Sequence, residues 1–292
     1  MASRRGGTTT ALLLGASMST TEARLAAGAP VTPTVAGWRY LSFETTVIGR
    51  EPLQIGNPRR EVAVVTLAGG VSLNIDGRRF DLPGRASVWD GRPWAAYLPA
   101  GTAADATSIG EEAVVALASA PLSGREGVSG EVIVIGPEDV KVEVRGAGNA
   151  TRQINHIITP DFPADRLEVV EVYTPSGNWS SWPPHKHDTD DMPREAVLEE
   201  VYSYRFRRPE AWGVQRLYGG SVEGLWAVRD GETVIVRDGY HPFVATHGDD
   251  AYYLNALAGD VRTMACSYDP SLDHVRSDWA AMEPDPRVPL AG

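Results

Sequence analysis

Two histidines separated by one residue are the strongest sign of chemistry in this sequence. His185 and His187 stand in the run Trp-Pro-Pro-His-Lys-His, with Lys186 between them. Because side chains alternate between the two faces of a β-strand, both imidazoles can point into one cavity while Lys186 points away. Imidazoles arranged in this way chelate divalent metal ions. The spacing therefore predicts part of a metal site.

Further metal ligands are available in the segments that follow. Glu199 and Glu200 begin the next candidate strand, and His241 stands directly after a turn, near the start of another strand. Three imidazoles and one carboxylate suit zinc, iron, manganese or nickel and leave coordination positions for water or substrate. His247 competes with His241, because the loop before it can fold inward. A lone pair of this kind also occurs as two polar surface residues, so other evidence is needed.

The elements that must position these residues are short β-strands. From Trp38 onward, runs rich in Val, Ile, Leu, Trp and Tyr are broken at close intervals by turn residues such as Asp76-Gly77. The predicted strands are 61–67, 71–75, 79–82, 86–89, 95–98, 106–109, 113–119, 167–173, 198–206, 213–218, 224–228, 233–236 and 252–258. This rhythm predicts an all-β fold with two antiparallel jelly-roll units in tandem.

We divide the chain into four parts. Residues 1–33 are dominated by Ser, Thr, Gly and Ala and are predicted to be a disordered tail. Residues 34–145 form the first unit, which contains no histidine, and residues 146–270 form the second unit, which holds the metal site. None of the six histidines precedes His156, so the metal ligands belong to the second unit. Residues 271–292 are expected to be an arm over the surface.

Composition excludes several classes of protein. The formal net charge of −11 over 292 residues argues against nucleic-acid binding and against an acidic membrane surface, since both need clustered basic residues. Cys266 is the only cysteine, which rules out an intramolecular disulfide and a cysteine-rich zinc module. Lys141 and Lys186 are the only lysines, so Schiff-base chemistry has few candidates.

The composition also favours a cytoplasmic protein. The apolar run 11–14 after Arg4-Arg5 is too short for a signal peptide, and Met18 offers a second start. No segment approaches the roughly twenty apolar residues of a membrane span. We expect a homo-oligomer with no nucleic-acid or membrane partner, and the first unit is a candidate for the contact between subunits.

Five segments together resemble a known family. They are GNWSSWPPHKHD at 177–188, LEEVYSYRF at 198–206, VQRLY at 214–218, GYHP at 239–242 and YYLNALAG at 252–259. They resemble the 5-deoxy-glucuronate isomerases of myo-inositol catabolism, and the similarity extends over about residues 37–272. The resemblance implies a bicupin fold, with a metal in the C-terminal cupin. It also implies conversion of 5-deoxy-D-glucuronate to 5-dehydro-2-deoxy-D-gluconate.

The resemblance also implies which residues bind the metal. The ligands would be the two histidines of the HxH pair, the glutamate directly before Val-Tyr and the histidine of GYHP, namely His185, His187, Glu200 and His241. Strand alternation then turns Tyr202 toward the metal and Glu199 away from it. The loop 243–250 is more polar than the family pattern, which leaves its substrate contacts open.

A carboxylate substrate needs a local cation in so acidic a protein. Arg216 is the predicted carboxylate contact, because a guanidinium binds a carboxylate through two parallel hydrogen bonds. A strand-edge salt bridge is the alternative role for this residue. Lys186 is a second candidate, although alternation turns it from the metal face, and Tyr202 and Tyr253 complete the predicted substrate contacts.

An aldose–ketose isomerase moves a proton between adjacent carbons through an enediol, whose oxyanion a divalent metal can stabilise. Glu195, Tyr202, Tyr253 and a metal-bound hydroxide are all candidates for the base, and the sequence does not choose among them. Two other functions stay open. A cupin dioxygenase can use the same ligands and would consume oxygen, whereas a sugar-acid binding protein would have no turnover.

Overall fold

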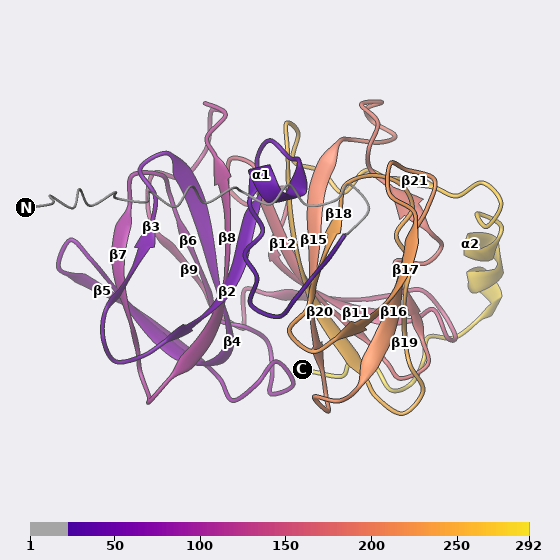
Figure 1. The fold of residues 1–292 in the computed structure, drawn as a ribbon, viewed down its shortest axis with the longest axis horizontal. Helices are drawn as coiled ribbons and strands as arrows, with labels where there is room; N and C mark the ends of the chain where they lie inside the picture. The colour runs from indigo at the N-terminus through magenta and orange to yellow at the C-terminus, as the bar shows by residue number, and fades with distance from the viewer. Residues whose placement is uncertain (1–22, 292) are drawn as a thin grey trace, which may run out of the picture.

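The computed structural model, which describes residues 23–291, has two β-sheet lobes that lie side by side (Figure 1). The N-terminal lobe is one eight-stranded antiparallel sheet with β2-β8-β4-β6-β9 as its main path, and β3, β5 and β7 pair along it. Its strands are β2 (Ser42–Ile48), β3 (Leu53–Gly56), β4 (Arg60–Ile75), β5 (Arg78–Arg85), β6 (Ala95–Leu98), β7 (Ala103–Ser108), β8 (Ala113–Pro121) and β9 (Ile133–Ile135).

The C-terminal lobe packs a seven-stranded sheet, β1-β18-β15-β20-β12-β11-β10, against a four-stranded sheet, β13-β19-β16-β17, and adds a β14-β21 ribbon. Its strands are β1 (Arg24–Leu25), β10 (Lys141–Arg145), β11 (Arg152–Ile158), β12 (Leu167–Thr174), β13 (Trp179–Ser180), β14 (His185–Lys186), β15 (Leu198–Phe206), β16 (Trp212–Leu217), β17 (Gly224–Arg229), β18 (Thr233–Val236), β19 (Phe243–Ala245), β20 (Ala251–Gly259) and β21 (Ser267–Tyr268).

Helices are few. They are α1 (Pro33–Ala36), α2 (Val275–Asp278) and the 3-10 turn η1 (Trp279–Ala281). Among residues 23–291, no helix is both long and apolar enough to span a bilayer. Because strands dominate and form two lobes in tandem, the predicted all-β, bicupin fold class is confirmed.

Strand alternation divides the apolar side chains among three cores. On β4, Val64 points into the N-terminal lobe while its neighbour Val65 points into a layer between the lobes. On β15, Tyr202 points into the C-terminal lobe while Val201 points into that same layer. Both faces of these strands are thus buried, which explains the long apolar stretch in β4; the buried polar residues of β15 instead need partners.

Two buried glutamates tie the lobes together through backbone hydrogen bonds. Glu199, on β15 of the C-terminal lobe, accepts from the N–H groups of Arg39 (2.6 Å), Tyr40 (2.9 Å) and Leu41 (2.7 Å). Glu61, on β4 of the N-terminal lobe, accepts from the N–H groups of residues 165–167 at 2.7 to 2.8 Å. Each carboxylate satisfies several donors at once, and such charge-assisted bonds are stronger than neutral ones. We call the pair the carboxylate clamps.

Several expectations from the sequence differ from the structure. Residues 23–33, placed in the disordered tail, are structured: β1 pairs with β18, and Ala23 and Val31 are buried. Residues 1–22 lie outside the described part of the chain. Strand β10 pairs with β11, so residues 141–145 belong to the second unit. The tail prediction relied on composition, which cannot detect a short strand that completes a distant sheet edge.

The strand predictions also need two corrections. The segment 86–89 is a turn, in which Trp89 N–H donates to the Ser87 hydroxyl, and β5 ends before it. The predicted strands 61–67 and 71–75 are one strand, β4, bent at a bulge beside Thr66. The Asp76-Gly77 hairpin is confirmed, with φ of 50° and 78° at its two turn residues.

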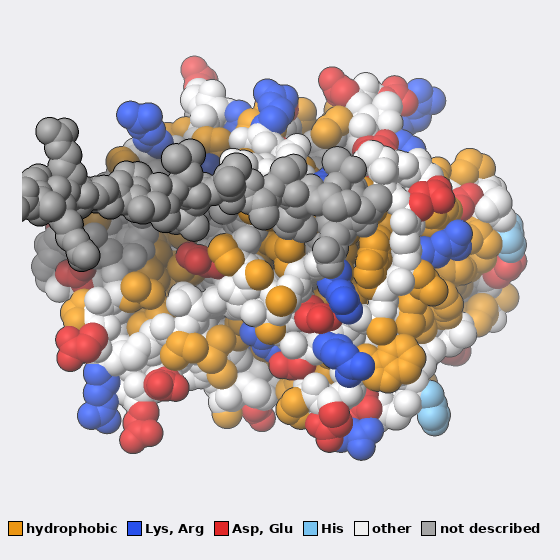
Figure 2. Space-filling view, in the orientation of Figure 1, with side chains coloured by type: hydrophobic (Ala, Val, Ile, Leu, Met, Phe, Trp, Pro, Cys, Tyr) orange, Lys and Arg blue, Asp and Glu red, His pale blue; other side chains and the backbone are white. Residues whose placement is uncertain are grey.

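The charged surface is mixed where it can be seen. On the described part of the face in Figure 2, Lys and Arg side chains stand among Asp and Glu side chains and do not form one basic patch. This face therefore gives no support to a phosphate-binding surface.

A buried carboxyl group should make stability depend on pH. Glu168, on β12, is 1% exposed, and burial raises its pKa to about 7 although Arg262 opposes this rise. Because the pKa in the folded protein exceeds the ordinary 4.5, the associated stability is present below pH 4.5 and is lost as pH rises through 7.

We expect Glu168→Gln to raise the melting temperature at pH 8 and to change it little at pH 4.5. The gain in unfolding free energy should be about 3 kcal/mol at most, from the size of the pKa shift. Thermal melts at both pH values measure the effect, with Glu44→Gln on the surface of β2 as the control. An equal change at both pH values would contradict this explanation.

Candidate metal centre and ligand pocket

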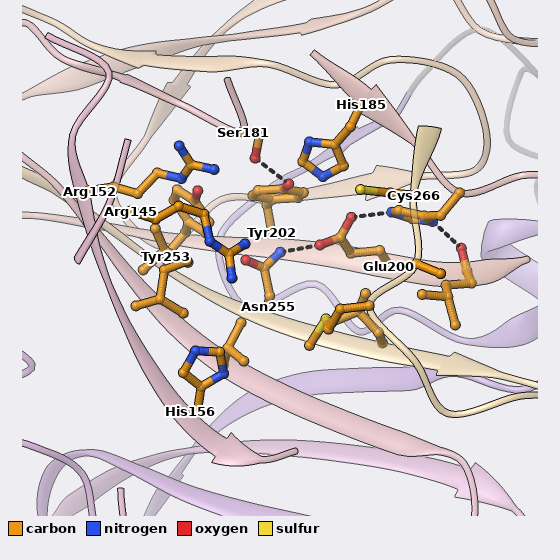
Figure 3. A pocket seen from close by; sticks show the side chains of 18 of the residues that line it. Arg145, Arg152, His156, Ser181, His185, Glu200, Tyr202, Tyr253, Asn255 and Cys266 are labelled. Carbon is orange, nitrogen blue, oxygen red and sulfur yellow. Dashed lines mark hydrogen bonds and ion pairs between the residues drawn. The ribbon is translucent and has the colours of Figure 1, made fainter. Parts of the chain in front are cut away.

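One pocket in the C-terminal lobe collects most of the predicted site residues (Figure 3). It has a volume of about 90 Å³ and is lined by residues of β10, β11, β12, β15 and β20 and of the β14-β21 ribbon. On β15, Glu200 and Tyr202 face the pocket, and Glu199 faces the other lobe. The predicted register of this strand therefore agrees with the structure.

Three predicted metal ligands form one cluster beside the pocket, which His187 and Glu200 line and His241 does not. His187, Glu200 and His241 are buried, and their ligand atoms all lie within 4.8 Å of one another. His187 Nε2 is 2.9 Å from Glu200 Oε2, and His241 Nε2 is 3.4 Å from the same oxygen. Glu200 Oε1 accepts a hydrogen bond from Asn255 Nδ2 at 2.7 Å, which orients the carboxylate.

Backbone carbonyls fix which nitrogen each imidazole presents. The Nδ1 atoms of His187 and His241 lie 2.9 and 3.0 Å from the carbonyl oxygens of Leu198 and Gly239. Since a carbonyl oxygen only accepts, Nδ1 carries the proton in both rings, and Nε2 is left facing the cluster.

The electrostatics of the cluster suit a cation. Burial lowers the pKa of His241 to about 4, and its buried Nε2 has no hydrogen-bond partner among the described residues. Burial also opposes protonation of His187, but its contact with Glu200 outweighs this and raises its pKa. An unprotonated nitrogen beside a carboxylate is the donor set that a divalent ion binds. The residues therefore fit a metal.

His185 lies beside this cluster. Its ring centroid is 4.6 Å from that of His241 and 6.3 Å from that of His187, and it lines the same pocket. Burial, together with the neighbouring imidazoles, lowers its pKa well below 6.5. The structure thus brings three of the four predicted ligands into one group and places the fourth against it.

Both predicted substrate-contacting tyrosines line the pocket. The Tyr202 hydroxyl is 2.8 Å from Ser181 Oγ, and the Tyr253 hydroxyl bonds with Ser180 Oγ. Burial raises the pKa of both phenols, so both are protonated at neutral pH. They present neutral hydroxyl groups next to the metal cluster.

Arg216 and Lys186 lie outside the pocket, which corrects their prediction as substrate contacts. On β16, Gln215 takes the inward position and donates to the His241 carbonyl at 2.8 Å, so Arg216 is turned outward. The exposed Arg216 guanidinium stacks on the Tyr218 ring at 4.0 Å. Lys186 forms ion pairs with Asp188 and Glu195.

Two further candidates also lie elsewhere. Glu195 accepts from Lys186 at 2.8 Å and from two backbone N–H groups, and it does not line the pocket. His247, the competing ligand, is exposed in the loop before β20. The choice of His241 over His247 agrees with the geometry.

Sequence reasoning did not single out several polar residues that line the pocket, and three of them matter most for its chemistry. They are Arg145, Arg152 and Asn255. Arg152 begins β11, and the residues that line the pocket from this strand are Arg152, Ile154 and His156, every second position. That spacing was visible in the sequence, but nothing local indicated which face of the strand met the histidines.

Known proteins resemble this chain over most of its length. The model of the KduI/IolB family matches residues 14–275. A protein of Geobacillus kaustophilus named 5-deoxy-glucuronate isomerase is 38% identical over 254 residues, which cover 85% of this chain and 88% of that protein. A protein of the same name from Bacillus subtilis is 34% identical over 218 residues, with 73% and 79% coverage.

Solved structures give a consistent result. An IolB-like protein from Salmonella typhimurium is similar with a TM-score of 0.82 and 32% identity, covering 88% of this chain and all of that one. Oxalate decarboxylase from Lactobacillus farciminis is similar with a TM-score of 0.56 and 12% identity, over 87% and 88% of the two chains. This second likeness concerns the fold alone.

Adjacent glutamates provide a matched test of the metal centre. We expect Glu200→Gln to reduce metal affinity by more than the roughly 10- to 100-fold typical of outer-shell changes. Glu199→Gln should keep the metal but melt at a lower temperature, because it weakens bonds to three backbone N–H groups. Metal content by mass spectrometry and thermal melts separate these effects. Loss of metal in Glu199→Gln alone would overturn the assignment.

Proposed function

This chain belongs to the KduI/IolB family, and from that membership we propose that it is a 5-deoxy-glucuronate isomerase. The reaction would convert 5-deoxy-D-glucuronate to 5-dehydro-2-deoxy-D-gluconate. The observation that carries the proposal is the buried His187, Glu200 and His241 cluster, which opens into a pocket in a chain whose relatives bear that name.

We propose that His185, His187, Glu200 and His241 together hold one divalent ion. Zinc is the first expectation for three imidazoles and a carboxylate, with iron, manganese or nickel as alternatives. When bound, such an ion supplies Lewis-acid polarisation of the substrate carbonyl. Asn255 and the carbonyls of Leu198 and Gly239 keep the ligands oriented.

The remaining residues bind and orient the substrate. Tyr202 and Tyr253 place hydroxyl groups in the pocket, each held by a serine, and they can donate hydrogen bonds to substrate oxygens. The apolar walls, including Val170, Val172 and Leu257, limit water around the enediol. Glu195 is less favoured as the base than the sequence suggested, because its carboxylate is engaged outside the pocket.

Location and assembly belong to the same proposal. A small sugar acid and a single cysteine, Cys266, fit the cytoplasm, where we place the protein. A homo-oligomer stays a prediction, which light scattering of the purified protein measures.

The decisive experiment supplies purified protein with 5-deoxy-D-glucuronate and follows the aldehyde proton by NMR, with and without prior chelation. We expect metal-dependent loss of the aldehyde signal, formation of the ketone and no oxygen uptake. Glu200→Gln should reduce turnover by about 100- to 1,000-fold or more, the scale for loss of transition-state charge stabilisation. Glu199→Gln is the matched control and should stay active.

Other outcomes would contradict the proposal. Oxygen uptake with loss of substrate would favour a dioxygenase. Binding without conversion by folded, metal-loaded protein would favour a sugar-acid binding protein.

A further inference from the structure

We propose that Arg152 forms an anion subsite that binds the carboxylate of the substrate at the opposite side of the pocket from the metal ligands. The inference rests on the proposed function for the identity of the substrate. It replaces Arg216, whose side chain points away from the pocket.

Arg152 is a buried cation without a matching anion. Its side chain lines the pocket, and the residue is 5% exposed. Its Nη1 donates to the carbonyl oxygens of Trp182 at 3.1 Å and Ala150 at 3.4 Å. Within residues 23–291, no carboxylate forms an ion pair with this guanidinium, and burial lowers its pKa. A buried, unpaired charge is costly, and an anionic ligand would offset that cost.

The neighbouring arginine is already neutralised. Arg145 forms two hydrogen bonds with Glu143, at 2.8 and 2.9 Å, and its side chain is 43% exposed. Glu143 also contacts His156 Nε2 at 2.8 Å. Arg145 therefore stands at the more open side of the pocket with its own partner. Of the two guanidinium groups, Arg152 is the one left to bind a ligand carboxylate.

The arrangement orients a sugar acid. Arg152 and Arg145 lie to one side of the pocket in Figure 3, and His185 and Glu200 lie to the other, with Tyr202 between them. In 5-deoxy-D-glucuronate the carboxylate and the aldehyde are at opposite ends of the carbon chain. A carboxylate held by Arg152 thus directs the aldehyde end toward the metal ligands. Such anchoring would select sugar acids over neutral sugars.

The test compares two substrates that differ only at the anchored end. 5-deoxy-D-glucose carries a hydroxymethyl group where 5-deoxy-D-glucuronate carries the carboxylate. We expect Arg152→Gln to lower kcat/KM for the acid by about 100-fold, as for loss of a charged hydrogen-bonding partner, and to change it for the neutral sugar by less than about threefold. Arg216→Gln removes the same charge outside the pocket. It should leave unchanged the ratio of kcat/KM for the acid to kcat/KM for the neutral sugar.

Two results would overturn the inference. One is an equal loss for both substrates in Arg152→Gln, which indicates a structural role. The other is an unchanged ratio in Arg152→Gln when the melting temperature matches that of the parent protein. If Arg152→Gln does not fold, Arg152→Lys replaces it. This variant keeps the charge but loses the bidentate contact, and we expect a rise in KM of about tenfold for the acid alone.

A binding measurement separates this inference from the proposed function. Calorimetry with as-purified protein should detect D-gluconate but not sorbitol, and Arg152→Gln should abolish the gluconate signal while Arg216→Gln keeps it. That pattern would support the anion subsite even if the parent protein did not isomerise 5-deoxy-D-glucuronate. Equal gluconate binding by the parent protein and Arg152→Gln would refute the subsite even if the isomerase activity were present.

Discussion

The three backbone hydrogen bonds to Glu199 fix the register of β15, and the position of the pocket side chains depends on that register. A strand shifted by one residue would turn Glu200 and Tyr202 out of the pocket. Glu199 cannot move inward without leaving buried N–H groups of the other lobe unpaired. The interaction that joins the lobes is therefore also the one that holds the metal-binding carboxylate on the correct face.

Local pattern predicted only part of the metal cluster, because strand alternation relates neighbouring positions and does not show which distant residues meet. The HxH spacing indicated His185 and His187, whereas the choice of Glu200 over Glu199 and of His241 over His247 relied on the family resemblance. Arg216 was misassigned because alternation within β16 was not tied to any buried residue; Gln215 takes the inward position. Arg152 escaped notice because only the three-dimensional packing shows that this face of β11 lines the pocket.

The fold was predictable to a similar degree, and for similar reasons. The predicted strand 198–206 coincides with β15, since β-branched and aromatic residues are frequent in it and apolar and polar residues alternate from Tyr202 to Phe206. The strand prediction for 86–89 was wrong because three apolar residues in a stretch of four also suit a packed turn. The sequence did not predict strand β1, because its two residues form a strand only by pairing with β18. That strand lies more than two hundred residues further along the chain.

The carboxylate clamps have a consequence for how such a protein can evolve. Glu61 and Glu199 each cap backbone of the opposite lobe, so neither barrel carries all the acceptors that its own buried amides need. A gene that lost the histidine-free half would encode a barrel with an orphaned buried carboxylate and an uncovered apolar sheet. The C-terminal lobe therefore depends on the N-terminal lobe for its stability. Selection for the reaction alone would preserve the N-terminal lobe, although none of the proposed metal ligands lies in it.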